Sequence, residues 1–331
     1  MPYTPSPPYL DAELSLAVEA ARDAGRIQLD RYERLERIVH KSERDVVTEV
    51  DHLCEELILG RVREAFPDDA ILAEESGEHV SHRGRGRGPA TGAERIWVVD
   101  PLDGTVNYAN GIPIFCVSIG LVVRGTPVLG VIFDPVRDEL FSALAGHGAR
   151  LDGRPIQHPV KEKLSDLVVS LALPWRGWRG RERRVRSVIR VARTLGSASL
   201  SLAYVGNGRF DAFIQPRGLS NWDVAAAGVI AAEGGAVVTD AAGGPWLDMA
   251  RPSRKVGILA AARQHHAELL RLLASEPGSR SGAARPLRRL HRPARGRLGD
   301  DHGRPGGGLR RGRLRGGRRS GRFARGVAGA G

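Results

Sequence analysis

Hydrophobic and polar positions along residues 11–275 change repeatedly between helical and strand spacing. Apolar residues recur at helical spacing over residues 11–39 and predict one long amphipathic helix. Residues 45–66 indicate a short strand followed by a second helix, which ends before Pro67. The apolar runs at 70–76 and 96–100 (IWVVD) are typical of buried strands, and the first of them ends in paired acids.

The second half of this region continues the alternation without a repeated unit. Residues 115–156 carry successive strands, with turns predicted at Arg124-Gly125 and Asp152-Gly153. Next come a strand in SDLVVSLAL, a basic helix from Arg183 to Leu195, and a helix leading into a strand over 196–214. An Ala-rich helix starts at WDVAAAG, stops at Gly234-Gly235 and passes into another strand, and a last helix covers 263–275. The pattern predicts an α/β fold in which helices and sheets are layered.

The last 56 residues differ from the rest in composition. Residues 276–331 contain 16 Arg, no Lys and three acids, a net charge of +13, so the other 275 residues carry −1 of the total of +12. This Gly- and Arg-rich segment has no sustained apolar periodicity and cannot bury enough surface to offset chain entropy. We therefore expect a folded domain over 1–275 and a disordered tail over 276–331.

Three interpretations of this tail stay open from the sequence. It could be a solvated extension, or the off-frame translation of a GC-rich gene, since Lys is missing and the composition changes abruptly. It could also be an RNA-binding segment of the Arg-Gly type, which holds phosphates without reading bases. Because the rest of the chain is nearly neutral, a nucleic-acid partner is expected for the tail at most.

The cellular location of the protein and the redox state of its cysteines are inferred from features that the sequence lacks. The chain has no run of about 18 apolar residues that would suggest a membrane span. Its N-terminus lacks the basic and apolar regions of a signal peptide. Cys54 and Cys116 do not have the spacing of a disulfide framework or a zinc site. We expect a cytoplasmic protein without a membrane partner.

Acidic residues form three clusters, each next to an apolar segment: Glu74-Glu75, Asp100 with Asp103, and Asp223. Two carboxylates as close as Asp100 and Asp103 repel one another unless a cation or a proton lies between them. Hard oxygen ligands without a nearby His or Cys favour Mg²⁺, with Mn²⁺ as the alternative. In DPLDGT, Pro101 stiffens the turn so that both carboxylates and the carbonyl between them could converge on one cation.

Each cluster taken alone has a plainer interpretation. A single DxxD is usually a helix cap plus a surface acid, paired glutamates after a strand are usually solvated, and an Asp after Trp is usually a helix N-cap. Their joint occurrence in one chain favours a metal site. Gly104 and Thr105, which follow the acids directly, could present backbone N–H groups to an anionic phosphate oxygen.

On these motifs the sequence resembles the inositol monophosphatase family of metal-dependent, lithium-sensitive phosphomonoesterases. The likeness covers residues 11 to about 272 and excludes the tail. It implies an αβαβα layered sandwich for a catalytic domain over 1–275. Five segments carry it: AEES at 73–76, WVVDPLDGTVNY at 97–108, WDVAAAGVIAAEGG at 222–235, KSERDVVTEVD at 41–51 and GSASLSLAYVGNGRFDAF at 196–213.

The resemblance implies a role for each acidic cluster. Glu74 would bind metal and help to orient the attacking water, and Asp100 would bridge two Mg²⁺ ions of a site that holds two or three. The carbonyl of Leu102, with Asp103 and Asp223, would complete the ligand set. In such a site, water activated by the metal ions attacks a phosphomonoester directly, without a covalent phosphoenzyme.

The resemblance also implies residues that act on the water and the substrate. Asp51 and Thr105 would form a hydrogen-bonded pair in which Thr105 accepts the proton of the water. Gly104 and Thr105 would bind the phosphate through their N–H groups, and Ser197 and Gln215 are the further candidates for substrate contacts. No histidine is expected to take part.

The sequence indicates the substrate less clearly than it indicates the reaction. In many inositol phosphatases an acid in the loop before Trp-Asp binds ring hydroxyls, whereas the loop here, FIQPRGLSNWD, offers Gln215, Arg217 and Asn221. Inositol 1-phosphate is the first expectation, and the resemblance implies a homodimer. Histidinol phosphate, fructose 1,6-bisphosphate and an aminocyclitol phosphate are the alternatives. Arg217 could favour a substrate with a second anionic group, or it could be a solvated loop charge.

A hypothesis of another class is a non-catalytic binding protein that has kept the phosphatase fold and uses an RNA-binding tail. The complete set of acidic residues argues against it, because the loss of a ligand is what an inactive enzyme would show.

Overall fold

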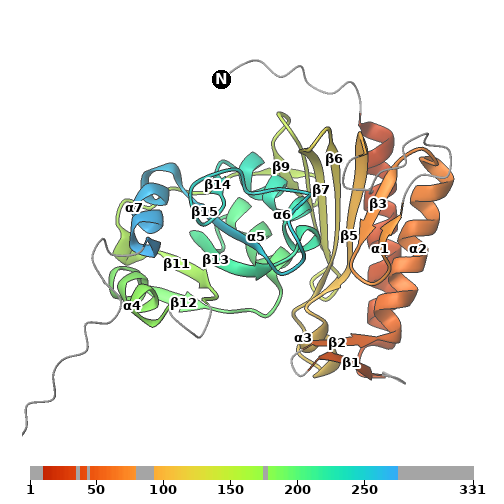
Figure 1. Ribbon diagram of the computed structural model, residues 1–331, viewed down its shortest axis with the longest axis horizontal. Coiled ribbons are helices and arrows are strands. Elements are labelled where there is room, and N and C mark those ends of the chain that lie inside the picture. Colours follow the sequence, from red (N-terminus) through yellow and green to blue (C-terminus); the bar gives the residue numbers. More distant parts are fainter. Residues whose placement is uncertain (1–9, 35–37, 43–44, 80–92, 174–177, 275–331) are drawn as a thin grey trace, which may run out of the picture. The chain divides into compact units, whose positions relative to one another are not determined.

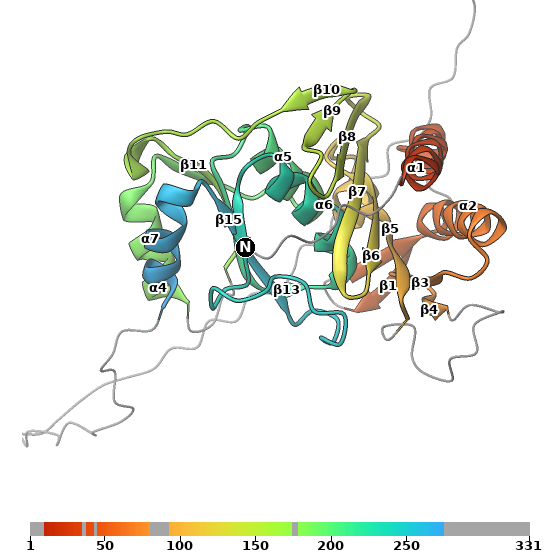
Figure 2. The same ribbon diagram turned by 90° about the horizontal axis from the view of Figure 1, so that it is seen from above.

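The computed structural model describes residues 10–34, 38–42, 45–79, 93–173 and 178–274. Their helices and strands form five alternating layers, with two helices, a large sheet, two helices, a smaller sheet and two further helices in succession (Figures 1 and 2). The expected αβαβα sandwich is confirmed.

The first two layers are an outer helix pair and a mostly antiparallel sheet of eight strands. The helices are α1 (Asp11–Arg31) and α2 (Glu49–Ala65), and they pack on one face of the sheet. The strand order is β10-β9-β8-β7-β6-β5-β3-β4, and within it only β3 and β5 pair in parallel. The strands are β3 (Ala70–Ala73), β4 (Gly77–His79), β5 (Arg95–Asp103), β6 (Cys116–Val123), β7 (Thr126–Asp134), β8 (Glu139–Leu144), β9 (Ala149–Leu151) and β10 (Arg154–Ile156).

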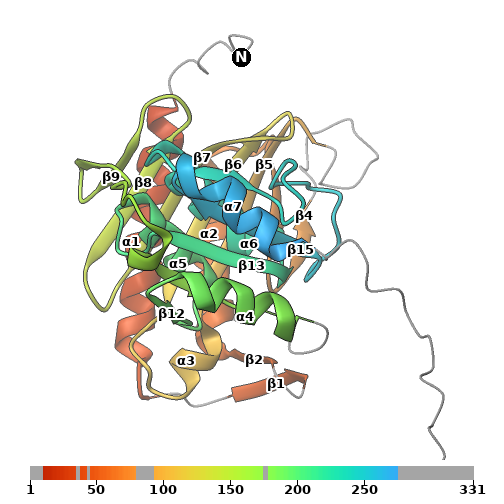
Figure 3. The same ribbon diagram turned by 90° about the vertical axis from the view of Figure 1, so that its left-hand side faces the viewer.

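The middle helices are α5 (Ala198–Gly206) and α6 (Asn221–Glu233), and the smaller sheet beyond them has the order β12-β11-β13-β15-β14. Its strands are β11 (Val168–Leu171), β12 (Val191–Arg193), β13 (Ala212–Leu219), β14 (Val237–Thr239) and β15 (Val256–Ala261). The outer helices α4 (Arg179–Val188) and α7 (Arg263–Leu273) lie side by side on its far face (Figure 3). The short elements are β1 (Ile38–Ser42) and β2 (Asp45–Thr48), which form a two-stranded ribbon, α3 (Thr105–Ala109) and a 3₁₀ turn at Leu164–Asp166.

The middle helices are buried on nearly every side because a sheet covers each of their faces. Accordingly α6 is rich in Ala and has no polar stripe, as a helix without a solvent face requires. A Cβ added at Gly130 of β7 would overlap the backbone carbonyl of Ala226 in α6. The large sheet and α6 therefore touch backbone to backbone, which places the start of α6 close to the strand ends that carry the site.

The predicted helix over 11–39 is too long. Helix α1 ends at Arg31, because Tyr32 is extended and Glu33 has a positive φ of 60°. The Tyr32 ring packs against the rings of Tyr108 and Phe115, at centroid distances of 5.5 and 5.2 Å. Ile38, which was expected in the helix, instead begins β1.

The predicted basic helix over 183–195 is displaced and too long. Helix α4 covers Arg179–Val188, and residues Val191–Arg193 form strand β12, which pairs in parallel with β11. Strand β15 has no counterpart in the sequence prediction. Both short strands depend on partners far away in the chain, which local periodicity does not report.

Both predicted turns are confirmed. Arg124-Gly125 and Asp152-Gly153 have positive φ at both positions, as the two-residue turn between antiparallel strands requires. The basic segment at 81–93, whose Gly- and Arg-rich sequence predicts a flexible surface loop, lies outside the described residues except for residue 93. The tail at 276–331 also lies outside them. None of the helices in the described ranges carries a long enough apolar stretch to cross a bilayer.

Candidate active site

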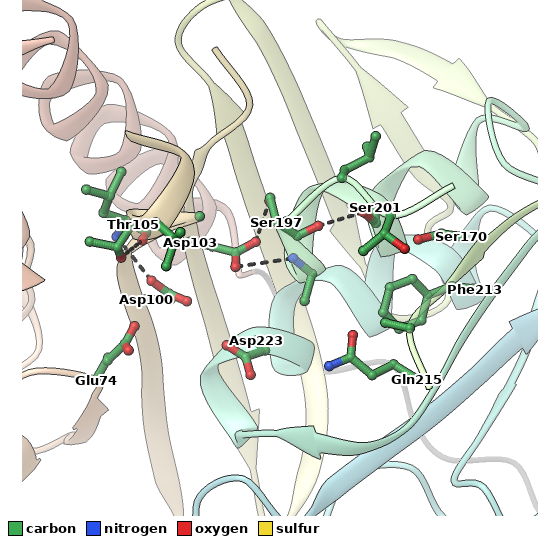
Figure 4. A pocket seen from close by; sticks show the side chains of 18 of the residues that line it. Glu74, Asp100, Asp103, Thr105, Ser170, Ser197, Ser201, Phe213, Gln215 and Asp223 are labelled. Carbon is green, nitrogen blue, oxygen red and sulfur yellow. Dashed lines mark hydrogen bonds between the residues drawn. The ribbon is translucent and has the colours of Figure 1, made fainter. Parts of the chain in front are cut away.

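A cavity of about 330 Å³ opens where strands of the large sheet meet the N-termini of the two middle helices (Figure 4). Every predicted site residue except Asp51 lines it, and Asp51 contacts a lining residue from behind. The lining residues already predicted are Glu74, Asp100, Leu102, Asp103, Gly104, Thr105, Ser197, Gln215 and Asp223.

Asp100 and Asp103 lie within an irregular stretch of β5, which runs beyond the predicted end at Asp100. Asp100 pairs with Ser118 and Asp103 with Cys116 of β6, and the register shifts between the two pairs. The N–H of Leu102 donates to Oδ1 of Asp100 at 3.1 Å. The shift brings both carboxylates to the same cavity, although they are three residues apart in a strand.

Glu74 reaches Asp100 because β3 and β5 are parallel neighbours. Its backbone N–H donates to the carbonyl of Val99 at 3.2 Å, which places residue 74 beside residue 100. The loop after it is held by Glu55, whose carboxylate accepts from the N–H groups of residues 75 and 76 at 2.9 Å each. In Figure 4 the carboxylate of Glu74 extends toward Asp100.

Asp103 is held at the N-terminus of α5. Its Oδ2 accepts from the Ser197 hydroxyl at 2.5 Å and the Ser199 N–H at 2.7 Å, and its Oδ1 accepts from the Ala198 N–H at 3.2 Å. The thiol of Cys116 lies 3.8 Å from Oδ2. Ser197 is thus occupied with positioning Asp103 and capping α5, and its contact with substrate stays a prediction.

Asp223 comes from the N-terminus of α6. Its Oδ2 accepts from the Ser220 N–H at 2.7 Å, and the Ser220 side chain caps the helix in return. This capping box sets the carboxylate opposite the large sheet. The plainer interpretation of Asp223 as the N-cap is wrong, because the N-cap is Ser220 and Asp223 is the third residue of the helix, the N3 member of the capping box. This role does not exclude a second one for the same carboxylate.

One carboxylate oxygen from each of Asp100, Asp103 and Asp223 can lie within 4.8 Å of the others. Burial raises the pKa of Asp100 well above its usual value, and repulsion by Glu74, Asp103 and Asp223 raises it further. Burial also raises the pKa of Asp103, against the lowering effect of its hydrogen bonds. Buried carboxylates that repel one another need a compensating charge, and an all-oxygen set suits a hard divalent cation such as Mg²⁺.

Beside this cluster, Thr105 and Asp51 are hydrogen-bonded as expected. Oγ1 of Thr105 lies 3.1 Å from Oδ1 of Asp51 and 2.9 Å from the Leu102 carbonyl. Oδ2 of Asp51 accepts from the N–H and hydroxyl of Thr48 at 2.8 and 2.7 Å. Burial raises the pKa of Asp51 to about 6.

Gly104 adopts a left-handed conformation, with φ of 99°. A Cβ there would lie 2.9 Å from the Ile114 carbonyl oxygen, so both the backbone angle and the space require glycine. The chain turns at Gly104 into α3, whose first N–H groups have no partner within the helix. This geometry is compatible with the expected phosphate contacts.

On the far side from Glu74 and Asp100, the cavity wall comes from the smaller sheet and α5, and it combines hydroxyl groups with apolar side chains such as Phe213 (Figure 4). The hydroxyl of Ser201 donates to the Ser197 carbonyl at 2.6 Å, and that of Thr194 donates to the Leu171 carbonyl at 2.9 Å. Since their protons are used, these oxygens face a ligand as hydrogen-bond acceptors. Such a wall suits a molecule that carries hydroxyl donors.

Several supporting residues were not found from the sequence. Gln28 of α1 donates through Nε2 to the Pro101 carbonyl at 2.8 Å, and Glu55 holds the loop after Glu74. Arg254 lines the cavity, whereas Arg217, the cation considered from the sequence, is exposed and is not a lining residue. Gln28 and Arg254 lie far from the motifs in the sequence. Glu55 follows the 41–51 motif by four residues, and its place among the apolar positions of a helix is the one signal that the sequence contained.

Comparisons with known proteins concern the whole domain that contains this cavity. The model of the inositol monophosphatase family matches residues 10–277. The protein called Nus factor SuhB of Pseudomonas aeruginosa is 38% identical over 240 residues, which cover 70% of this chain and 86% of that one. Inositol monophosphatase 2 of Solanum lycopersicum is 37% identical over 237 residues, covering 70% of this chain and 88% of that one.

Solved structures show the same relationship. The extragenic suppressor protein SuhB of Bartonella henselae superimposes with a TM-score of 0.72 at 33% identity, covering 80% of this chain and all of that one. The inositol monophosphatase of Anabaena gives a TM-score of 0.68 at 35% identity, covering 80% and 96%. With its motifs gathered at one cavity of the shared fold, the chain belongs to the inositol monophosphatase family.

Proposed function

We propose that the protein is a Mg²⁺-dependent phosphomonoesterase that acts on a small polyol or sugar phosphate, with inositol 1-phosphate as the first candidate. The observation that carries the proposal is the convergence of Asp100, Asp103 and Asp223 on one cavity beside the Asp51–Thr105 pair. Relatives that are named inositol monophosphatases also support it.

Metal ions held by Glu74, Asp100, Asp103, Asp223 and the Leu102 carbonyl would supply Lewis-acid activation of a water and neutralise charge on the phosphoryl group. The chain itself positions the reactants. Thr105 accepts the proton of the attacking water through Oγ1, while its own hydroxyl proton passes to Oδ1 of Asp51. The N–H groups of Gly104 and Thr105 hold phosphoryl oxygens, and the acceptor-lined wall receives the hydroxyls of the alcohol.

The first experiment is phosphate release from inositol 1-phosphate, histidinol phosphate, fructose 1,6-bisphosphate and adenosine 3′,5′-bisphosphate, each with Mg²⁺ and with a chelator. We expect turnover that needs the metal and that lithium at about millimolar concentration inhibits, the latter on the family resemblance. Folded protein that releases no phosphate from any of them with Mg²⁺ would refute the enzymatic proposal. Light scattering of the same sample tests the proposed homodimer.

A second candidate function is a non-catalytic binding protein with an RNA-binding tail. It is favoured by the name Nus factor that several relatives carry and by the 16 Arg of residues 276–331. The complete carboxylate set favours catalysis instead. A variant that lacks residues 276–331 separates the two. Unchanged turnover is expected from it, and loss of binding to a short single-stranded RNA would assign that binding to the tail.

A further inference from the structure

Arg254 stands out as the cation of the cavity. Of the lining residues, all within the described part of the chain, it is the only one with a positive charge, and four others are the carboxylates assigned to metal. It is exposed and lies in the turn that precedes β15. It therefore adds a positive charge to a lining that is otherwise acidic or neutral.

Strand pairing places the backbone of Arg254 near the strand that carries Gln215, the residue expected to contact the alcohol part of the substrate. Leu219 of β13 pairs with Val256 of β15, so residue 254 lies near the end of the strand that carries Gln215. In Figure 4 the Gln215 amide lies beyond Asp223 as seen from Glu74 and Asp100. A group attached to the alcohol, and not the transferred phosphoryl group, would lie nearest to Arg254.

The backbone of Arg254 is held in an unusual conformation. Its φ is 60°, in the left-handed region that costs a non-glycine residue about 1 kcal/mol. Its N–H donates to Oγ of Ser220 at 3.1 Å, and that Oγ lies 2.8 Å from Oγ of Ser253. The N–H of Ser220 also donates to Asp223. Ser220 therefore hydrogen-bonds both to the backbone of Arg254 and to a proposed metal ligand.

We propose that Arg254 selects substrates whose alcohol part carries a second anionic group, a phosphate or a carboxylate. A guanidinium binds either group through paired charge-assisted hydrogen bonds. The neutral Gln215 in place of an acid removes the repulsion that such a group would otherwise meet. This inference rests on the proposed phosphatase function and names its substrate class. It assigns to Arg254 the preference for a second anionic group that the sequence analysis considered for Arg217.

The test compares substrates that differ only in the second anion. Fructose 1,6-bisphosphate is paired with fructose 1-phosphate for a second phosphate, and 3-phosphoglycerate with glycerol 3-phosphate for a carboxylate. The measured quantity is the ratio of kcat/KM within each pair. The two pairs distinguish the two sources of negative charge.

We expect wild-type protein to prefer the doubly charged member of at least one pair. Arg254→Gln should lower that ratio about tenfold, the loss of roughly one charge-assisted hydrogen bond, and Arg254→Lys should keep part of it. The ratio should also fall as salt rises, because Arg254 is exposed. The matched control Arg217→Gln should leave the ratio unchanged.

Arg254→Gly separates selectivity from folding. Glycine adopts the left-handed conformation without strain, so this variant should unfold at the wild-type temperature or above it and still lose the preference. A ratio that Arg254→Gln leaves within about twofold of wild type would overturn the proposal. So would an equal loss on both members of a pair, which would place Arg254 on the transferred phosphoryl group.

Failure of the phosphatase function would be seen separately, as absence of turnover by wild-type protein on all four compounds. The inference would then be tested by binding. Fructose 1,6-bisphosphate should raise the unfolding temperature in Mg²⁺ more than fructose 1-phosphate does, and Arg254→Gln should abolish the difference. Equal shifts in wild-type protein would overturn the inference.

Discussion

The hydroxyl oxygen of Thr105 lies 3.1 Å from Oδ1 of Asp51, although 54 residues separate the two in the chain. Asp51 is buried in the first turn of α2, where Thr48 holds its other oxygen. Thr105 follows directly on the DPLDG stretch. The hydrogen bond thus joins the outer helix layer to α3, directly after the strand that carries Asp100 and Asp103, and it orients a hydroxyl beside the carboxylate cluster.

Removing either member of this pair should slow the reaction without unfolding the protein. Thr105→Ala and Asp51→Asn are each expected to lower kcat about 100-fold, because the proton of the attacking water loses its oriented acceptor. Initial rates of phosphate release measure this, and Thr126→Ala, at the exposed start of β7, is the control. If Thr105→Ala kept most of the wild-type kcat, the hydroxyl would have no part in proton transfer.

Asp100→Asn should abolish turnover and yet stabilise the metal-free protein. Asp100 is buried and repelled by Glu74, Asp103 and Asp223, so a neutral side chain relieves the repulsion. We expect a higher unfolding temperature without metal, no further rise on addition of Mg²⁺, and less than about a tenth of wild-type kcat/KM. A variant that kept more activity, or still responded to Mg²⁺, would show that Asp100 does not bridge the ions.

Without metal, the protein should lose stability as the pH rises from about 4 to above 6. Burial raises the pKa of Asp51 to about 6, and burial with repulsion raises that of Asp100, so the folded chain holds these protons more tightly than the unfolded chain. The stabilisation is complete below about pH 4 and disappears as the pH passes the folded-state values.

Mg²⁺ competes with those protons for the same carboxylates. The rise in unfolding temperature that Mg²⁺ causes should therefore be larger at about pH 8 than at about pH 5, as scanning calorimetry can measure. An equal rise at both values would mean that the buried carboxylates are not the Mg²⁺ ligands.

Ser197→Ala tests whether this residue serves the metal site or the substrate. Its hydroxyl donates to Asp103 at 2.5 Å and accepts from the Leu200 N–H at 3.3 Å, as the N-cap of α5. We expect the free energy of unfolding to fall by about 1 kcal/mol and the Mg²⁺ concentration for half-maximal rate to rise, with KM nearly unchanged. A raised KM at unchanged Mg²⁺ requirement would instead support substrate contact. Ser187→Ala, on an exposed face of α4, is the control.

Two glycine substitutions test the packing behind the site. Gly130→Ala should lower the free energy of unfolding by about 3 kcal/mol, because its Cβ would overlap the backbone of α6 at Ala226. Gly60→Ala is the matched control. Gly60 is exposed in the middle of α2 with no atom within 4 Å of an added Cβ, so alanine should stabilise the protein by roughly 1 kcal/mol. Equal effects of the two changes in chemical denaturation would contradict the backbone contact.

The sequence by itself determined the layered fold class, the two hairpin turns and the residues of the carboxylate cluster. Turns such as Arg124-Gly125 follow from local backbone preferences, which the residues themselves carry. Asp100 and Asp103 were recognisable because they lie close together in one short motif next to an apolar run. The structure keeps this local pattern because the apolar run and the acids that follow it belong to one buried strand.

Tertiary structure decided what depends on distant partners. The parallel pairing of β3 with β5 places Glu74 beside Asp100, and pairing with β11 makes a strand of residues that the sequence placed in a helix. The contacts of Gln28 and the position of Arg254 also come from elements far from the motifs. The physical reason is that periodicity reports how a segment is buried, while strand pairing and packing, which no local pattern encodes, determine which segment it meets.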